Sequence, residues 1–319
     1  MKKILITGAT GFIGQAVTTE LLKQSYNVHA TVRVPSPTLP KAVQQHIIGD
    51  LTTLTNKLSV LDDTDVIIHL AARAHIMDET ANDPLTEFRK VNTTATLNLA
   101  RQAAAAGVQR FIFISSIKVN GETTPPDQAF KTEIDTPPCD PYALSKYEAE
   151  QGLLSLAQNT KMEVVIIRPP LVYGPGVKAN FASLIKWLNK GIPLPFGAID
   201  NQRSLLAVDN LSSFIILCID HPKAANEIFL IADGEDISTT ELLQKIAQAL
   251  HKKARLLPVP VYWMSFIAQL IGKQAINSRL FASLQADSSK AKDLLGWQPI
   301  STMDEQLSKI AEDYHTNSP

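Results

Sequence analysis

The chain has 319 residues, enough for a large buried core and for about two domains. Hydrophobic residues make up 45%, charged residues make up 19% and the formal net charge is −1, so neither disorder nor a global attraction to nucleic acid is expected. Two cysteines, Cys139 and Cys218, are too few for a disulfide framework and favour a reducing cytoplasm. The longest uninterrupted apolar run, Phe214 to Ile219, is too short for membrane insertion.

Short β-branched runs alternate with longer segments of helical periodicity through the first half of the chain. This alternation predicts an α/β fold of the Rossmann type, a doubly wound parallel sheet with crossover helices. One helix is expected from Asp83-Pro84 to Gly107 and another from Asp140-Pro141 onwards, because each starts with a capping Asp and a Pro. The strands are expected at about 3–7, 27–33, 46–48, 65–70, 110–115 and 163–168.

The character of the sequence changes after residue 168, where Pro- and Gly-rich loops surround one short helix expected near 181–190. An apolar run at 227–232 is expected to return to the sheet as a strand, followed by helices near 239–251 and 261–273. We therefore expect a dinucleotide-binding domain over residues 1–168 and a smaller C-terminal region, 169–319, that mainly binds the substrate.

Three glycines in the spacing Gly-x-x-Gly-x-x-Gly follow the first expected strand and open a helix. Gly8 allows a tight turn, Gly11 lets a pyrophosphate approach the backbone, and Gly14 lets the helix pack closely on the strand. The amides of this turn, which includes Phe12 and Ile13, and the helix dipole can hold the anion. The position between strand and helix favours a dinucleotide site over a plain tight loop.

The second expected strand ends at Arg33, where a dinucleotide fold normally carries an acidic residue for the ribose hydroxyls. A guanidinium suits a 2′-phosphate, so the sequence favours NADP over NAD, with an ordinary solvated arginine as the alternative. Asp50, followed by Leu51 after the third strand, is a candidate for binding the adenine amino group or else a turn residue.

Tyr142 and Lys146 are four residues apart, so on a helix both side chains lie on one face. The Lys146 ammonium can then favour the phenolate of Tyr142, whose reference pKa of about 10 makes it a poor base at neutral pH. Ser116 follows the fifth strand, at the sheet edge where such folds bind ligands, and can hydrogen-bond the same substrate oxygen. The three residues are predicted to form a proton relay at one carbinol.

The chain resembles the extended short-chain dehydrogenase/reductases, the NAD-dependent epimerase/dehydratase family, over nearly its whole length. The resemblance rests on the glycine turn, on the three relay residues and on four further motifs. These motifs are His69-Leu70-Ala71-Ala72, Val91-Asn92, Arg168-Pro169 and Val172-Tyr173-Gly174-Pro175-Gly176.

The resemblance implies a UDP-sugar substrate, a possible homodimer and further binding residues. Ala71, Ala72 and Asn92 would line the cofactor site. Asn180 would contact the substrate, and Arg203 would clamp its diphosphate through a bidentate guanidinium, with Arg279 a second candidate for the same anion.

The reaction is left open between two kinds of hydride transfer at sugar C4. Ser115 and Ser116 stand where dehydratases of the family carry Asp and Glu, so dehydration is not expected. Asn120 stands where its epimerases usually carry Tyr. With the NADP preference, this places a UDP-4-keto-sugar reductase of surface-polysaccharide synthesis slightly ahead of a UDP-hexose 4-epimerase. A non-catalytic dinucleotide sensor is a remote alternative, and no metal is expected because the histidines show no ligand spacing.

Overall fold

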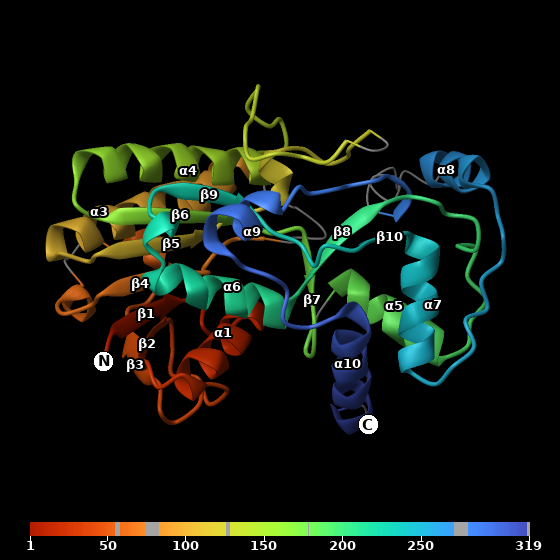
Figure 1. Cartoon of the computed structure of the whole chain (residues 1–319), viewed down its shortest axis with the longest axis horizontal. Coiled ribbons are helices and arrows are strands. Elements are labelled where there is room, and N and C mark those ends of the chain that lie inside the picture. The colour runs from red at the N-terminus through yellow and green to blue at the C-terminus, as the bar shows by residue number, and fades with distance from the viewer. Residues whose placement is uncertain (55–57, 75–82, 126–127, 178, 271–279, 318–319) are drawn as a thin grey trace.

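The computed structural model describes residues 1–54, 58–74, 83–125, 128–177, 179–270 and 280–317. In these residues the chain forms a seven-stranded parallel sheet with helices on both faces and a smaller mixed sheet of three strands (Figure 1). Within the described part of the chain, every helix falls short of the length and apolar character that crossing a bilayer requires.

The large sheet confirms the expected doubly wound fold. Its strand order is β3-β2-β1-β4-β5-β6-β9, and every neighbouring pair is parallel. The order reverses between β1 and β4, and open α/β sheets bind ligands at the carboxyl ends of strands on either side of such a point. The strands are β1 (Lys3–Thr7), β2 (Asn27–Val32), β3 (Gln44–Ile47), β4 (Val66–His69), β5 (Arg110–Ile114), β6 (Glu163–Arg168) and β9 (Glu227–Leu230).

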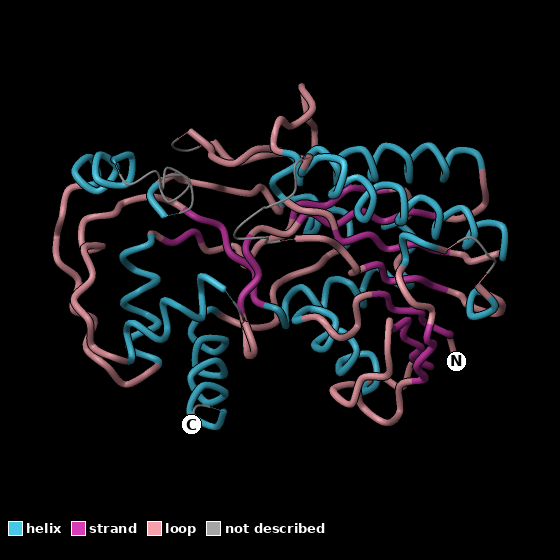
Figure 2. Tube along the Cα trace, turned by 180° about the vertical axis from the view of Figure 1, so that it is seen from behind, coloured by secondary structure: helices cyan, strands magenta, loops and turns pink. Residues whose placement is uncertain are grey.

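Each face of the large sheet carries its own buried core, because side chains alternate along a strand. Ile4 and Ile6 of β1 pack in the core that includes α1 (Phe12–Lys23) and α6 (Val208–Asp220). Leu5 points the other way, into the core that includes α3 (Thr96–Ala106) and α4 (Pro141–Asn159). Figures 1 and 2 show these two helix pairs on opposite sides of the sheet.

The segment expected as one helix from Asp83 to Gly107 is helical throughout but changes type. Asp83 caps α2 (Pro84–Phe88) by accepting a hydrogen bond from the Thr86 amide at 3.2 Å. A π-helical turn, Arg89–Ala95, then leads into α3, which ends at Gly107 in the left-handed conformation with a φ of 87°. Such π turns are frequent at functional sites, and this one carries Asn92.

Between residue 168 and the strand expected at 227–232, the sequence predicts loops around one short helix, and the structure corrects this. The small sheet has the order β10-β8-β7, formed by β7 (Leu171–Tyr173), β8 (Arg203–Ala207) and β10 (Asp236–Ile237). The strands β7 and β10, of three and two residues, are too short to show alternation. Helix α6 was also missed, because nine of its 13 residues are buried and no polar stripe marks a solvent face.

We call the part of the molecule around the small sheet the smaller lobe. The remaining helices complete this lobe and attach the C-terminal end of the chain to the large sheet. The run expected to return as a strand is β9, which pairs with β6. The helix expected at 261–273 is α8 to residue 270, and its last residues lie outside the described part. The helices are α5 (Ala179–Asn189), α7 (Thr239–Ala249), α8 (Val261–Leu270), α9 (Ser289–Leu295) and α10 (Met303–Asn317).

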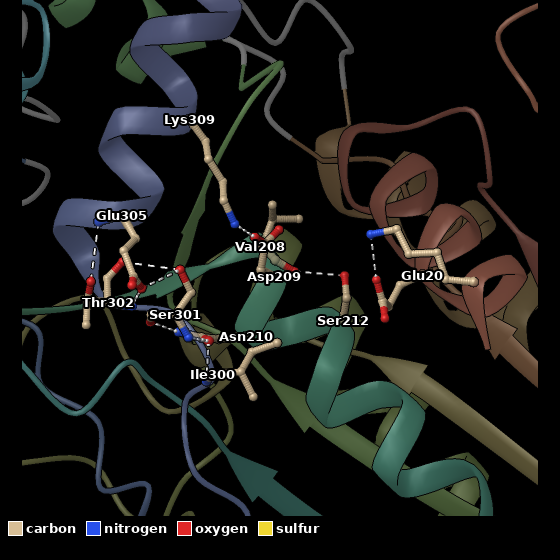
Figure 3. A network of polar contacts seen from close by, with 11 residues as sticks. Glu20, Val208, Asp209, Asn210, Ser212, Ile300, Ser301, Thr302, Glu305 and Lys309 are labelled. Carbon is tan, nitrogen blue, oxygen red and sulfur yellow. Dashed lines mark hydrogen bonds and ion pairs between the residues drawn. The ribbon is translucent and has the colours of Figure 1, made fainter.

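A buried asparagine joins α6 to the segment that leads into α10 (Figure 3). Asn210 donates to the Ser301 carbonyl at 2.8 Å and to the Asp233 carboxylate at 2.7 Å. Its own side-chain oxygen accepts from the amides of Ile300 at 2.8 Å and Ser301 at 2.9 Å. The side-chain amide therefore uses all four of its hydrogen-bonding positions on the protein.

Candidate active site

The glycine turn after β1 is shaped by close backbone approaches. Gly8 has a φ of 74°, and a Cβ there would lie 2.7 Å from the Ala71 amide nitrogen at the end of β4. A Cβ on Gly14 would lie 2.2 Å from the Gly8 carbonyl oxygen. Gly11 caps α1 without a side-chain bond, which leaves the amides around Phe12 and Ile13 at the helix start for an anion. The turn therefore fits the pyrophosphate of a dinucleotide, as the spacing predicts.

A buried histidine fixes the strand ends beside this turn. His69 Nδ1 lies 2.7 Å from Thr7 Oγ1, and its Nε2 lies 2.9 Å from Thr96 Oγ1. Thr7 Oγ1 also accepts a hydrogen bond from the Ala71 amide at 3.2 Å. Burial, with a smaller effect of the Lys146 charge, lowers the pKa of His69 to about 3. His69 is therefore a neutral link between β1, β4 and α3.

The structure brings together the three residues predicted to form the proton relay. Ser116 follows β5, and Tyr142 and Lys146 lie one turn apart on α4. Burial raises the pKa of Tyr142 to about 12, while a hydrogen bond with the Ser116 side chain acts in the opposite direction. Tyr142 is therefore protonated at neutral pH in this state and is held next to the serine hydroxyl.

The side chain of Lys146 contacts the end of β5. Its Nζ donates to the Ile114 carbonyl at 2.9 Å and lies 4.5 Å from the centre of the Phe113 ring. Burial lowers the pKa of Lys146 to about 7, and the negative charge of Glu150 opposes this shift. Lys146 can therefore gain or lose its proton near neutral pH.

A buried ion pair that the sequence reading missed lies one turn beyond Lys146. Glu150 and Arg168 are 0% and 1% exposed, and Arg168 Nη2 lies 2.6 Å from a Glu150 carboxylate oxygen. Arg168 also donates to the Asn120 side chain at 3.2 Å and to the Thr132 carbonyl at 2.7 Å. The pair thus connects α4, β6 and the segment after Ser116. The four-residue spacing of Tyr142, Lys146 and Glu150 is the signal that could have revealed it.

Asn92, predicted to contact the cofactor, is buried and engaged with protein groups. Its Nδ2 donates to Ser145 Oγ at 3.0 Å and to the Arg73 carbonyl at 3.1 Å, and its Oδ1 accepts from the Arg73 amide at 2.9 Å. Ser145 in turn donates to the Tyr142 carbonyl at 2.7 Å. Asn92 therefore ties the segment after β4, which includes the exposed Ala72, to α4.

Arg33 and Asp50 mark the predicted adenosine end of the site. Arg33 is exposed and directly follows β2, and Asp50 is exposed after β3. Asp50 accepts a hydrogen bond from the Thr52 amide at 2.8 Å, and Leu51 begins the short helical turn that follows. Hydrogen bonds from Thr52 lower the pKa of Asp50, and the charge of Arg33 adds to this. Arg33, predicted to bind a 2′-phosphate, therefore has the Asp50 carboxylate nearby.

The predicted substrate residues lie in the smaller lobe. Arg203 begins β8, and its Nη1 donates to the Ala282 carbonyl at 2.8 Å. Asn180 lies in the first turn of α5, with its side chain outside the described part, and Arg279 lies outside the described residues altogether.

Known proteins resemble this chain in sequence and in fold. The model of the NAD dependent epimerase/dehydratase family matches residues 4–232. A UDP-glucose 4-epimerase from Vibrio cholerae is 49% identical over 318 residues, covering 98% of this chain and 95% of the relative. A GDP-6-deoxy-D-mannose reductase from Pseudomonas aeruginosa is 25% identical over 327 residues, covering 99% of this chain and 98% of the reductase. The crystal structure of a Thermotoga maritima UDP-glucose 4-epimerase with UDP-glucose has the same fold, with a TM-score of 0.79 at 24% identity over 99% of this chain and all of the other.

Proposed function

The chain belongs to the NAD dependent epimerase/dehydratase family, and we propose that it is a 4-epimerase of UDP-glucose or a related UDP-hexose. The observation that carries the proposal is the cluster of Ser116, Tyr142 and Lys146 at the end of β5, in a chain 49% identical to a UDP-glucose 4-epimerase. The sequence alone places a ketoreductase slightly ahead. The relatives favour the epimerase, because the reductase among them is only 25% identical.

The relay residues support a cycle that consumes no reductant. A bound nicotinamide dinucleotide supplies the hydride acceptor for C4 and afterwards the hydride donor. For this step Tyr142 must be the phenolate: it would take the proton of the C4 hydroxyl as that carbon is oxidised and return it as the carbon is reduced from the opposite face. Ser116 orients the same oxygen, and the Lys146 ammonium stabilises the phenolate.

Binding roles in the smaller lobe follow from the same proposal. Arg203, the first residue of β8, would pair the substrate diphosphate through its guanidinium. This guanidinium donates to the Ala282 carbonyl and so faces the segment around Ala282. Asn180 would contact the substrate from the start of α5, and Arg279 is the second candidate for the diphosphate. On the cofactor side, Ala71 and Ala72 follow β4 directly beside the Gly8 turn, where they would contact the dinucleotide.

We propose NAD as the resident dinucleotide, in place of the NADP that Arg33 alone favours. An epimerase returns its hydride and gains nothing from a reduced cofactor pool. Binding of NAD⁺ and NADP⁺ to the purified protein, measured by calorimetry, should favour NAD⁺. Tighter binding of NADP⁺ would restore the 2′-phosphate role of Arg33.

One assay distinguishes the two reactions. The purified protein is mixed with UDP-glucose and NAD⁺, and separately with NADPH and a UDP-4-keto-6-deoxy-N-acetylhexosamine. An epimerase forms UDP-galactose while the absorbance of the nicotinamide stays constant. Stoichiometric loss of NADPH absorbance with the keto sugar, and no interconversion of UDP-hexoses, would instead support the reductase.

A further inference from the structure

Helix α8 presents its aromatic side chains to solvent. Tyr262, Trp263 and Phe266 are 66%, 53% and 55% exposed, and the spacing i, i+1, i+4 places them on one face of the helix. Met264, on another face, is 8% exposed and packs inward. A surface helix normally directs its apolar stripe to the core, so this arrangement indicates an outer surface that binds something apolar.

Two chain segments at the same end of the molecule add further exposed apolar side chains. They are joined by hydrogen bonds from the Leu194 amide to the Arg255 carbonyl at 2.9 Å and from the Leu257 amide to the Leu194 carbonyl at 2.8 Å. Figures 1 and 2 show both segments running side by side at the end of the molecule far from the large sheet, one of them leading into α8. Ile192 and Leu257 on these segments are 42% and 52% exposed.

The same edge is built from sequence that lacks acidic residues. Residues 181–199 and 250–270 contain no Asp or Glu, and they carry two and three Lys or Arg residues, although the whole chain has a net charge of −1. In the part of the chain that the structure describes, the exposed cations of this edge take part in no ion pair. These cations are Lys186, Lys190, Lys252, Lys253 and Arg255.

We propose that this edge, which we call the α8 edge, docks the enzyme peripherally on an anionic phospholipid surface. Trp and Tyr side chains favour the boundary between headgroups and acyl chains, and Lys and Arg beside them attract anionic headgroups. Helix α8 has ten residues, so it would lie in the interface and not cross it. A second copy of the chain fits the edge less well, because symmetric pairing would bring two cationic surfaces together.

The test is co-sedimentation of the full chain with vesicles of phosphatidylcholine alone and of phosphatidylcholine with phosphatidylglycerol. We expect binding to be about tenfold tighter to the anionic vesicles and to weaken in high salt. The double variant Trp263→Ser, Phe266→Ser should lose most of this binding, and Lys252→Gln, Lys253→Gln should lose its salt-sensitive part. Ile300→Ser, at a side chain 67% exposed away from the α8 edge, is the matched control and should bind as the original protein does.

Turnover of a freely soluble UDP-hexose should be unchanged in the α8 variants, which shows that they are folded and keeps this test separate from the proposed reaction. Equal binding to both kinds of vesicle, no binding to either, or α8 variants that bind anionic vesicles as well as the Ile300→Ser control would overturn the proposal. Sedimentation velocity without lipid tests the other occupant: an oligomer that the α8 variants dissociate would assign the edge to a second copy of the chain.

Discussion

At the scale of single residues, the hydroxyl of Tyr142 is the group whose chemistry is easiest to isolate. Its ring packs edge-on against Phe88 with centroids 5.8 Å apart, so Tyr142→Phe keeps the packing and removes only the hydroxyl. We expect turnover to fall by about two to four orders of magnitude, the usual contribution of a positioned acid or base. Dinucleotide binding should be retained. Steady-state rates and cofactor titration check both expectations, and a variant with near-normal turnover would remove Tyr142 from the relay.

Glu150 acts through Lys146 and is therefore a positioning residue. Glu150→Gln removes the charge that raises the pKa of Lys146 and leaves the Arg168 guanidinium buried without its partner. The pKa of Lys146 should fall further. As the pH is raised, activity that needs the ammonium should therefore be lost at a lower pH than in the original protein. The free energy of unfolding should fall by about 3–5 kcal/mol. The pH profile of kcat and urea unfolding measure the two effects.

Glu148→Gln on the same helix, which breaks only the surface pair with Arg89, is the control. A purely structural role for Glu150 predicts lost stability with an unmoved pH profile.

At the scale of elements, the attachment of α10 to α6 depends on the side-chain amide of Asn210. Asn210→Ala leaves the buried Ser301 carbonyl and amide and the part-buried Ile300 amide without their partner, at a cost of about 3 kcal/mol in the free energy of unfolding. Lys309→Ala, which breaks the partly exposed pair between α10 and Asp209 in the same network, should cost less than about 1 kcal/mol (Figure 3). Urea unfolding of the two variants gives the comparison, and equal losses would mean that the network does not fasten the helix as described.

At the scale of the whole molecule, buried neutral histidines predict acid sensitivity. Burial lowers the pKa of His69 to about 3 and that of His29 to about 4, whereas in the unfolded chain both titrate near 6.5. The unfolded state therefore binds more protons between pH 6.5 and these lowered values. The stability present above pH 6.5 is lost as the pH falls through that window.

His69→Asn tests this at one site. The variant should be less stable at pH 7, because the bonds to Thr7 and Thr96 are lost, but its stability should fall less steeply toward pH 4. Urea unfolding at both pH values measures the slope, and His315→Gln, at an exposed position on α10, should keep the original slope. An unchanged slope in His69→Asn would mean that other groups cause the acid loss.

The sequence by itself determined the features whose information lies within a few neighbouring residues. The strand, glycine turn and helix from Lys3 to Lys23 are encoded by spacing and periodicity, as are the helix from Pro141 and the shared face of Tyr142 and Lys146. Local backbone geometry sets these features, so they predict the large sheet and the candidate relay without knowledge of distant contacts.

Only the tertiary structure decided the features that depend on partners far along the chain. The ion pair of Glu150 with Arg168 joins residues 18 apart, and the bond between Thr7 and His69 joins residues 62 apart. The strands of the small sheet are stabilised by one another, and β7 and β10 are too short to show a pattern. From the sequence alone, α8 looks like any other amphipathic helix. Burial and pairing are properties of the folded whole, because desolvation costs and hydrogen bonds depend on which groups the fold brings together.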